Sequence, residues 1–256
     1  MDERSNPIRR HGQYKHPAKR ILFVVSNPAE LKGFAVGFFA EELTRPFFDF
    51  IQAGYEVDVV SPKGGEVRFD GFSDPEDPSS AYPNDLITIG FRHHAVFGEL
   101  MKDTKSIDEV DPSDYDAICV AGGGGPLITF KDDEKLHALV AAFYEQGRVV
   151  GLICHGTCLL LWTRLSNGQL LADGKTWTGY PDSEEQMMNA AAGIEINEYT
   201  IESEARKNPN TTFESAGPLE PFAIRDGRLI TAQQQHSTYL LSQLVIEALS
   251  EAEAQA

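Results

Sequence analysis

The stretch VVGLICHGTCLLL, from Val149 to Leu161, constrains the fold more than any other part of the chain. An apolar run suited to a buried strand stops at Cys154, and a second apolar run with helical spacing begins at once. A strand that turns directly into a helix is half of the βαβ unit from which parallel sheets are built. The sequence therefore predicts an α/β domain in which this turn lies at the carboxyl end of a strand.

The same alternation runs through most of the chain. Strands and helices at these spacings imply a parallel sheet that is covered on both faces and has right-handed crossovers. A hairpin around Asp226-Gly227 and a short stretch at 194–197 complete the domain. We expect strands at 21–25, 56–60, 115–120 and 148–153, and helices at 35–52, 132–146, 155–165 and 237–248.

The chain divides into one large domain and short flanking segments. Residues 1–18 are basic but lack the apolar core of a secretory signal, so we interpret them as a flexible arm. Residues 19–250 form a single domain, and 251–256 form a short tail. Within the domain, residues 61–95 are rich in Pro, Asp, Ser and Gly; we interpret them either as an excursion from the sheet that covers another part of the molecule or as a disordered insert.

Composition excludes several classes of function. The net charge of −17 argues against a nucleic-acid partner, because a phosphate backbone requires a basic face. The apolar runs are too short to cross a bilayer, so no membrane association is expected. Three cysteines without paired spacing indicate a reducing compartment, and we expect a cytoplasmic protein. We assign no metal site to His93-His94 or to the Cys154–Cys158 pair, because both lack further ligands.

Cys154 is the strongest candidate for chemistry. Ligands of an open parallel sheet bind at the carboxyl ends of its strands, where a sharp strand-to-helix turn forms a nucleophile elbow. The start of the following helix favours the thiolate, so we expect a lowered pKa for this thiol. A lone cysteine in an apolar run is usually a core residue, and that is our assignment for Cys119 and Cys158. The His-Gly pair after Cys154 favours the reactive interpretation.

Three segments resemble a known family. AGGGG at 121–125, LICHGT at 152–157 and GFFAEELTRPF at 37–47 are similar to motifs of the ThiJ/PfpI superfamily, particularly its glyoxalase III-like branch. The resemblance extends from about Lys19 to Ala248. It implies a flavodoxin-like three-layer α/β/α sandwich with a mainly parallel sheet, a nucleophilic cysteine at an elbow, a buried glutamate from the first helix, and a homodimer.

The resemblance also implies roles for individual residues. The nucleophile falls on Cys154 with His155 beside it, and the glutamate falls on Glu42, while Glu41 is expected to face solvent. An acid three residues after a Pro-Asp pair orients the histidine; this position is Glu185, although Glu184 is an equally acidic alternative. The glycine run implies oxyanion and substrate contacts at Gly123 and Gly124, together with the amide of His155.

The chain departs from the branch at several of these positions. Gly124 replaces a histidine, Thr129 stands near an expected aspartate, Thr157 replaces a proline, and Ala232 to Gln235 replace a GQNP motif. Because a glycine at position 124 adds no side chain, we expect a roomier and less polar pocket. These differences put the reaction in question more than the fold.

Three functions follow from these residues. The first is a cofactor-free lyase of the D-lactate dehydratase type, in which Cys154 adds to a small reactive carbonyl and a 2-oxoaldehyde becomes a 2-hydroxy acid. The second is a redox-sensing or stress-response chaperone that depends on the same thiol or on apolar surface. The third is an amidase or glutamine-amidotransferase-like hydrolase, which would use a late histidine such as His236.

Overall fold

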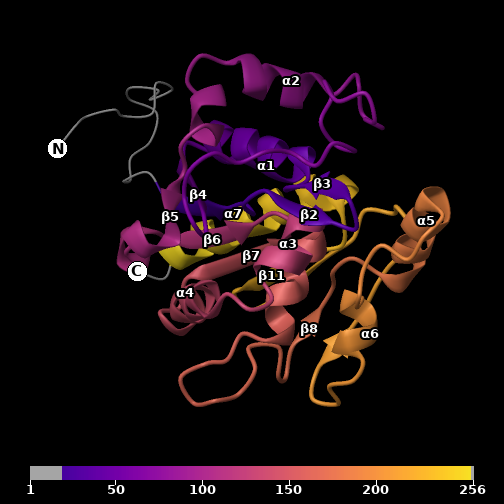
Figure 1. The fold of residues 1–256 in the computed structure, drawn as a ribbon. Coiled ribbons are helices and arrows are strands. Elements are labelled where there is room, and N and C mark those ends of the chain that lie inside the picture. Colours follow the sequence, from indigo (N-terminus) through magenta and orange to yellow (C-terminus); the bar gives the residue numbers. More distant parts are fainter. Residues whose placement is uncertain (1–18, 255–256) are drawn as a thin grey trace.

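The computed structural model describes residues 19–254 and shows a seven-stranded sheet within them (Figure 1). The strand order is β10-β11-β7-β6-β1-β4-β5, and every neighbouring pair is parallel except β10 and β11. This mainly parallel sheet confirms the predicted fold class. The strands of the sheet are β1 (Arg20–Val24), β4 (Glu56–Ser61), β5 (Lys105–Ser106), β6 (Ala117–Val120), β7 (Val149–Ile153), β10 (Ala223–Asp226) and β11 (Leu229–Ala232).

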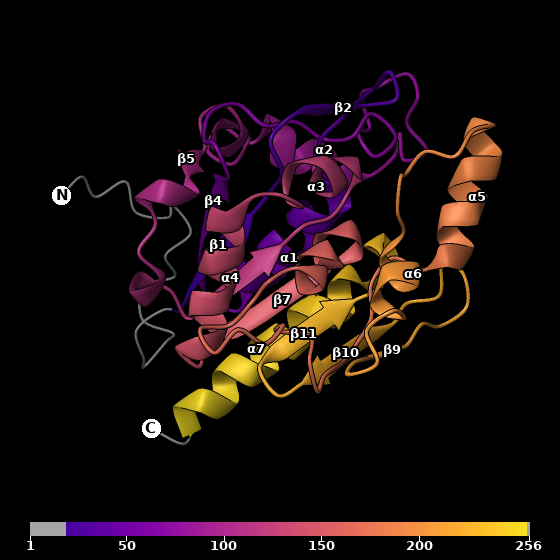
Figure 2. The same cartoon turned by 60° about the horizontal axis from the view of Figure 1, so that its bottom comes forward.

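Helices cover both faces of the sheet (Figures 1 and 2). One face carries α1 (Ala40–Gln52) and α7 (Thr238–Ala254), which pack against each other. The other carries α3 (Gly124–Thr129), α4 (Glu134–Glu145) and the 3-10 helix η4 (Cys154–Leu161). Two helices, α5 (Asp182–Ala192) and α6 (Ile201–Ala205), and the short strands β8 (Thr176–Trp177) and β9 (Thr212–Phe213) lie beyond the carboxyl end of β7 in the chain.

Three local predictions differ from the structure. The first helix begins at Ala40, because residues before it form a hairpin of β2 (Ala29–Leu31) and β3 (Phe34–Val36). The segment after β7 winds as a 3-10 helix instead of an α-helix. The last helix continues to Ala254, beyond the expected end at Ala248. The arm predicted for residues 1–18 lies outside the described residues.

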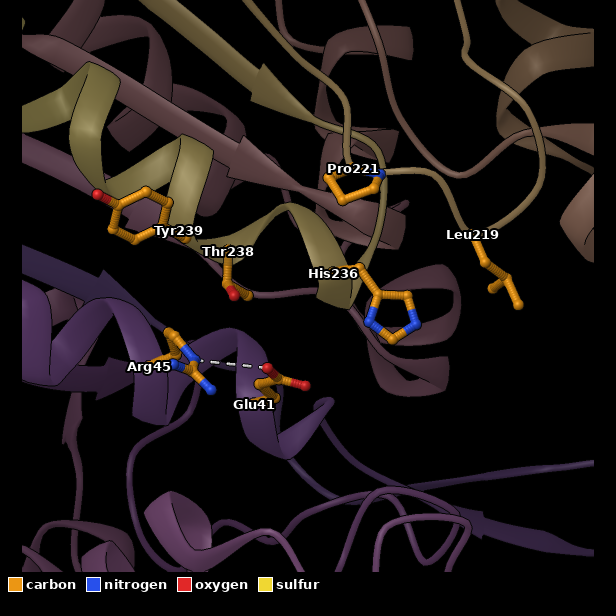
Figure 3. Close-up of a pocket in the computed structure, with 7 residues that line it drawn as sticks. All are labelled: Glu41, Arg45, Leu219, Pro221, His236, Thr238 and Tyr239. Atoms are coloured by element: carbon orange, nitrogen blue, oxygen red, sulfur yellow. Dashed lines mark ion pairs between the residues drawn. The ribbon is translucent and has the colours of Figure 1, made fainter.

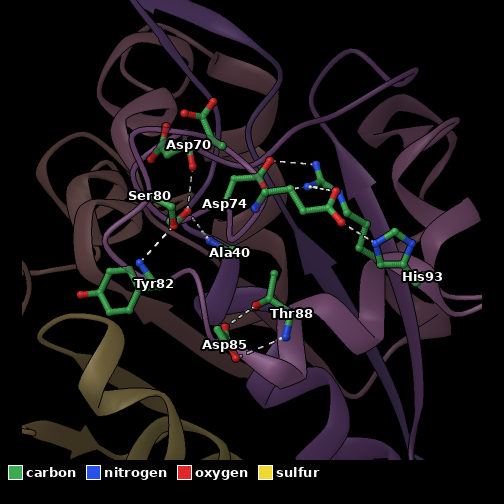
Figure 4. Close-up of polar contacts among 12 residues, drawn as sticks. Ala40, Asp70, Asp74, Ser80, Tyr82, Asp85, Thr88 and His93 are labelled. Carbon is green, nitrogen blue, oxygen red and sulfur yellow. Dashed lines mark hydrogen bonds and ion pairs between the residues drawn. The ribbon is translucent and has the colours of Figure 1, made fainter.

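Residues 61–95 form an ordered cover over α1. Helix α2 (Leu86–His93) begins where the Asp85 carboxylate accepts the N–H groups of Ile87 and Thr88 (Figure 4). Its Phe91 ring packs edge-on against Phe47 of α1, with ring centroids 5.1 Å apart. Aromatic burial and a capped helix therefore hold this segment against α1. Three short 3-10 helices follow this segment in the chain: η1 (Gly98–Met101), η2 (Ile107–Glu109) and η3 (Pro112–Asp114). A further one, η5 (Gln235–Ser237), precedes α7.

The register of the sheet brings the candidate residues to one edge. Val120 of β6 pairs with Leu152 of β7, and Ile153 pairs with Ala232 of β11. The glycine run, Cys154 and Gln233 therefore leave the sheet at the same end, next to the start of α1. No helix among residues 19–254 is long and apolar enough to span a bilayer.

Gly156 holds the elbow against β6. A Cβ at this position would lie 2.8 Å from the Ala121 carbonyl oxygen, so we expect Gly156→Ala to cost about 1–3 kcal/mol in the free energy of unfolding. The matched control is Gly90→Ala on α2, where a Cβ meets no atom within 4 Å and helix propensity predicts a gain of about 0.5–1 kcal/mol. Urea unfolding of both variants checks this. Equal stability of the two would show that the elbow tolerates a methyl group.

Candidate active site

Cys154 occupies the tip of the turn between β7 and η4. Its φ of 55° lies in the left-handed region, which a residue with a Cβ enters only under strain. The side chain is only 2% exposed. The backbone N–H groups of Gly123 and His155 both interact with the sulfur. The turn therefore places one thiol in front of two free amides, which is the geometry of a nucleophile elbow with its oxyanion donors.

His155 links this thiol to a glutamate. Its Nδ1 lies 3.6 Å from the Cys154 Sγ, and its Nε2 lies 2.8 Å from Glu185 Oε1. The other oxygen of Glu185 accepts a hydrogen bond of 2.7 Å from the Asn197 side chain. With Nε2 donating to Glu185, Nδ1 is the ring nitrogen that can accept the thiol proton.

Glu184 lies apart from the histidine. Its Oε1 accepts hydrogen bonds from the Gln233 side chain at 2.7 Å and from the Leu219 N–H at 3.1 Å. The geometry therefore chooses Glu185 over Glu184 as the partner of His155, a choice that the sequence had left open.

Glu42 reaches the thiol from the first turn of α1. Its Oε2 accepts the Gly122 N–H at 2.6 Å, and its carboxyl interacts with the Cys154 sulfur. The residue is fully buried, and its Oε1 has no hydrogen-bond partner of good geometry among the described residues. Burial raises the pKa of Glu42 to about 8, more than the hydrogen bonds from Cys154 and Gly122 lower it. At neutral pH this carboxyl therefore holds a proton beside the sulfur.

The expected lowering of the thiol pKa is wrong for the resting site. Burial raises the pKa of Cys154 well above its usual value, and the neighbouring Glu42 carboxyl raises it further. The amides of Gly123 and His155 act in the opposite direction but are outweighed. A helix start lowers a thiol pKa only where the dipole stabilises the thiolate more than the loss of water destabilises it. Here the sulfur is buried, and the loss of water dominates. The resting nucleophile is a thiol that must be deprotonated when substrate binds.

The two glycines of the predicted oxyanion and substrate contacts, Gly123 and Gly124, direct their N–H groups to different partners. Gly123 has a φ of 98° and directs its N–H to the sulfur, whereas the Gly124 N–H donates at 2.8 Å to Asp70 Oδ2. Gly124 is therefore not an oxyanion donor. A Cβ at Gly124 would lie 3.0 Å from a methyl group of Val36, so a side chain at this position would have to displace Val36 slightly.

Asp70 is a site residue that the sequence did not indicate. It lies in the covering segment (Figure 4). Its carboxylate accepts the N–H of Gly37 at 2.6 Å and that of Gly124 at 2.8 Å. Burial raises its pKa to about 6. It ties the entry of α1 to the glycine run and so positions Gly123. One aspartate among many in an acid-rich loop carries no sequence signal, because backbone pairing of Phe38 with Phe69, remote in sequence, brings it here.

Two tyrosines enclose the thiol. Tyr180 lies against the His155 ring, with ring centroids 4.3 Å apart. The Tyr82 hydroxyl accepts a hydrogen bond of 2.9 Å from the Gln235 side chain, and its pKa is raised by burial and by the nearby Glu41, Glu42 and Cys154.

Glu41 departs from the expectation that it faces solvent, since its side chain is only 18% exposed and pairs with Arg45. Cys119 and Cys158 are buried in the core. Within residues 19–254, no three potential metal ligands gather at one point.

Comparison with known proteins now places the chain in a family. The sequence model of the DJ-1/PfpI family matches residues 93–248, which is more than half of the chain. The chain belongs to the DJ-1/PfpI family. The resemblance drawn from the three motifs is thereby confirmed.

Individual relatives belong to the glyoxalase branch of this family. Glyoxalase 3 of Candida albicans is 28% identical over 84% of this chain and 91% of its own length. The glutathione-independent glyoxalase HSP31 of Saccharomyces cerevisiae is 28% identical over 90% of this chain and 98% of its own. The crystal structure of glyoxalase III from Candida albicans superposes with a TM-score of 0.76 at 26% identity, covering 90% of this chain and 97% of that one.

Proposed function

We propose that this protein is a glutathione-independent glyoxalase that converts a 2-oxoaldehyde and water into a 2-hydroxy acid without a cofactor. The observation that carries the proposal is the position of the Cys154 thiol between the Glu42 carboxyl and the His155–Glu185 pair. The relatives named as glyoxalases support the same reaction.

The first step forms a covalent adduct. His155 Nδ1 takes the thiol proton, and the sulfur adds to the aldehyde carbon of the substrate. The amides of Gly123 and His155 hold the oxygen on which negative charge develops. Glu42 gives its proton to that oxygen, which leaves a hemithioacetal, a carboxylate at Glu42 and a protonated His155. Glu185 stabilises the charged ring through its bond to Nε2.

The second step moves hydrogen between the two carbons. The Glu42 carboxylate removes the proton from the former aldehyde carbon, and His155 protonates the ketone oxygen to give an enediol. Glu42 returns its proton to the second carbon while the enediol hydroxyl on the first carbon loses its proton to His155. The first carbon is thereby oxidised to a thioester and the second is reduced to an alcohol, so no external redox partner is needed.

Hydrolysis closes the cycle. Water gives one proton to Glu42 and adds to the thioester carbonyl, and the sulfur leaves with the proton held by His155. The products are the 2-hydroxy acid, a free thiol and a protonated Glu42, which is the state that the pKa of about 8 predicts for the resting site. Lactate formation from methylglyoxal in the absence of glutathione tests the proposal directly, and no lactate at any pH between 6 and 9 would reject it.

The two adjacent glutamates of α5 provide a matched test of the His155 assignment. We expect Glu185→Gln to lower kcat/KM for methylglyoxal about 100-fold, because the amide stabilises the charged ring poorly. Glu184→Gln should change it less than about fivefold, since this residue contacts Gln233 and Leu219 instead. Steady-state kinetics of both variants measures the difference. A larger loss in Glu184→Gln would refute the assignment of Glu185.

The hydrolase interpretation has less support in this geometry. His236 contacts the side chain of Gln235 at 3.4 Å, and the histidine beside Cys154 is His155. A homodimer, which the family resemblance implies, is part of our proposal and is tested by analytical ultracentrifugation of the purified protein.

A further inference from the structure

A pocket of about 500 Å³ lies between the first turn of α1 and the start of α7 (Figure 3). Glu41 and Arg45 of α1 form one side, and Thr238 and Tyr239 of α7 form another. His236 and the loop at 219–221 close the remaining side. None of these residues takes part in the reaction described above.

This pocket shares its walls with the thiol site. At three places along the chain, one residue contacts groups of the thiol site while the residue next to it lines the pocket or hydrogen-bonds to a residue that lines it. The pairs are Glu42 and Glu41 on α1, Glu185 and Glu184 on α5, where Glu184 fixes the Leu219 backbone, and Gln235 and His236 before α7. Side chains of neighbouring residues point in different directions, so each pair places one residue at the thiol site and the next at the pocket or its lining.

Tyr82 lies near both groups of residues. Its hydroxyl is held by Gln235 and interacts with Glu41 on the pocket side and with Glu42 and Cys154 on the catalytic side. Tyr82 therefore has neighbours in both the catalytic group and the pocket lining.

The pocket offers donors to an anion. The Arg45 guanidinium pairs with Glu41 through Nε at 3.5 Å, and its two Nη nitrogens have no ion-pair partner among residues 19–254. Thr238 is only 2% exposed, and it lines the pocket from the start of α7. In Figure 3 its hydroxyl points across the pocket toward Arg45 and Glu41. Two parallel N–H donors of an arginine match the two oxygens of a carboxylate.

The charge of Glu41 restricts the ligand further. This carboxylate fixes the guanidinium from one side and repels a group with more than one negative charge. A protein with a net charge of −17 attracts an anion only where a local positive field exists, and Arg45 provides one here.

We propose that this pocket is the outer subsite of the active centre, where Arg45 and Thr238 bind a carboxylate at the end of a 2-oxoaldehyde remote from its aldehyde group. The inference rests on the proposed function and names its preferred substrate class. Methylglyoxal is too short to occupy this subsite, so the subsite adds affinity only for longer, singly charged oxoaldehydes.

The test compares 4,5-dioxopentanoate, its neutral methyl ester and methylglyoxal as substrates. We expect kcat/KM for the acid to exceed that for the ester about tenfold, and Arg45→Met to abolish this preference mainly through KM. The same variant should leave methylglyoxal turnover within about twofold. The matched control is Arg206→Met on the far helix α6, since Arg206 also pairs with a glutamate four residues earlier. Equal kcat/KM for acid and ester, or a preference that survives in Arg45→Met, overturns the inference while leaving the glyoxalase proposal intact.

Binding measurements separate the two proposals if turnover is absent. Calorimetric titration of Cys154→Ala protein with 4,5-dioxopentanoate reports on the subsite without any chemistry. We expect about tenfold weaker binding when Arg45→Met is added to this variant. Binding that does not depend on Arg45 overturns the subsite, whereas Arg45-dependent binding without lactate formation by the unmodified protein overturns only the glyoxalase proposal.

Discussion

Cys154→Ala should lower kcat/KM for methylglyoxal by about 10⁴-fold or more, because every covalent step of the proposed reaction passes through this sulfur. The amides of Gly123 and His155 remain in place in this variant, but without a nucleophile they have no oxyanion to hold. The measurement is lactate formed per mole of enzyme under initial-rate conditions, with glutathione excluded.

The control for this substitution is Cys158, a second cysteine in the same 3-10 helix, η4. Cys158 follows one helical turn later and is fully buried, and its thiol lies 3.9 Å from the Pro126 carbonyl oxygen. Cys158→Ala should keep activity within about threefold, at a cost of about 1 kcal/mol in stability for the small cavity. Lactate formation that persists in Cys154→Ala at the level of Cys158→Ala would show that the thiol is not the nucleophile.

The central sheet could be predicted because its strands carry a strong local signal. Runs such as Ile21 to Val24 are buried on both faces, and burial on both faces produces continuous apolar sequence. The first helix was placed too early because apolar residues at 34–39 continue its pattern. In the structure these residues belong to the β2–β3 hairpin, and the spacing of apolar residues along the chain does not predict such strand pairing.

The site could be predicted only in part. The elbow motif and the family resemblance indicated Cys154, His155, Glu42 and Glu185, which the structure brings together. Asp70, by contrast, arrives from a segment remote in sequence and acts through two backbone amides.

The ionisation of the thiol was mispredicted for a related reason. The helix start is visible in sequence, whereas the burial that outweighs it depends on how distant segments enclose the sulfur.

Glu42→Gln should raise stability at neutral pH and nearly abolish activity. The buried carboxyl has its pKa raised to about 8, from 4.5 in an unstructured chain, so between these values the folded protein holds a proton that the unfolded chain releases. The free energy of unfolding therefore falls as pH rises through this window, by about 1.4 kcal/mol per pH unit for this group. A glutamine has no proton to release, so the stability of the variant relative to the unmodified protein should increase by about 2–3 kcal/mol between pH 5 and pH 7.

Urea unfolding at pH 5, 6 and 7 measures this change, with Glu134→Gln as the control. Glu134 also stands in the first turn of a helix, but it is exposed, and its substitution should shift stability by less than about 0.5 kcal/mol at each pH. The activity of Glu42→Gln should drop about 10³-fold, because an amide cannot carry protons between the two substrate carbons. A variant that is inactive but equally destabilised at every pH would mean that Glu42 is held ionised in the fold. Between pH 5 and pH 8 the buried acid lowers the free energy of unfolding, and its role as a proton carrier in the reaction explains why the protein keeps it.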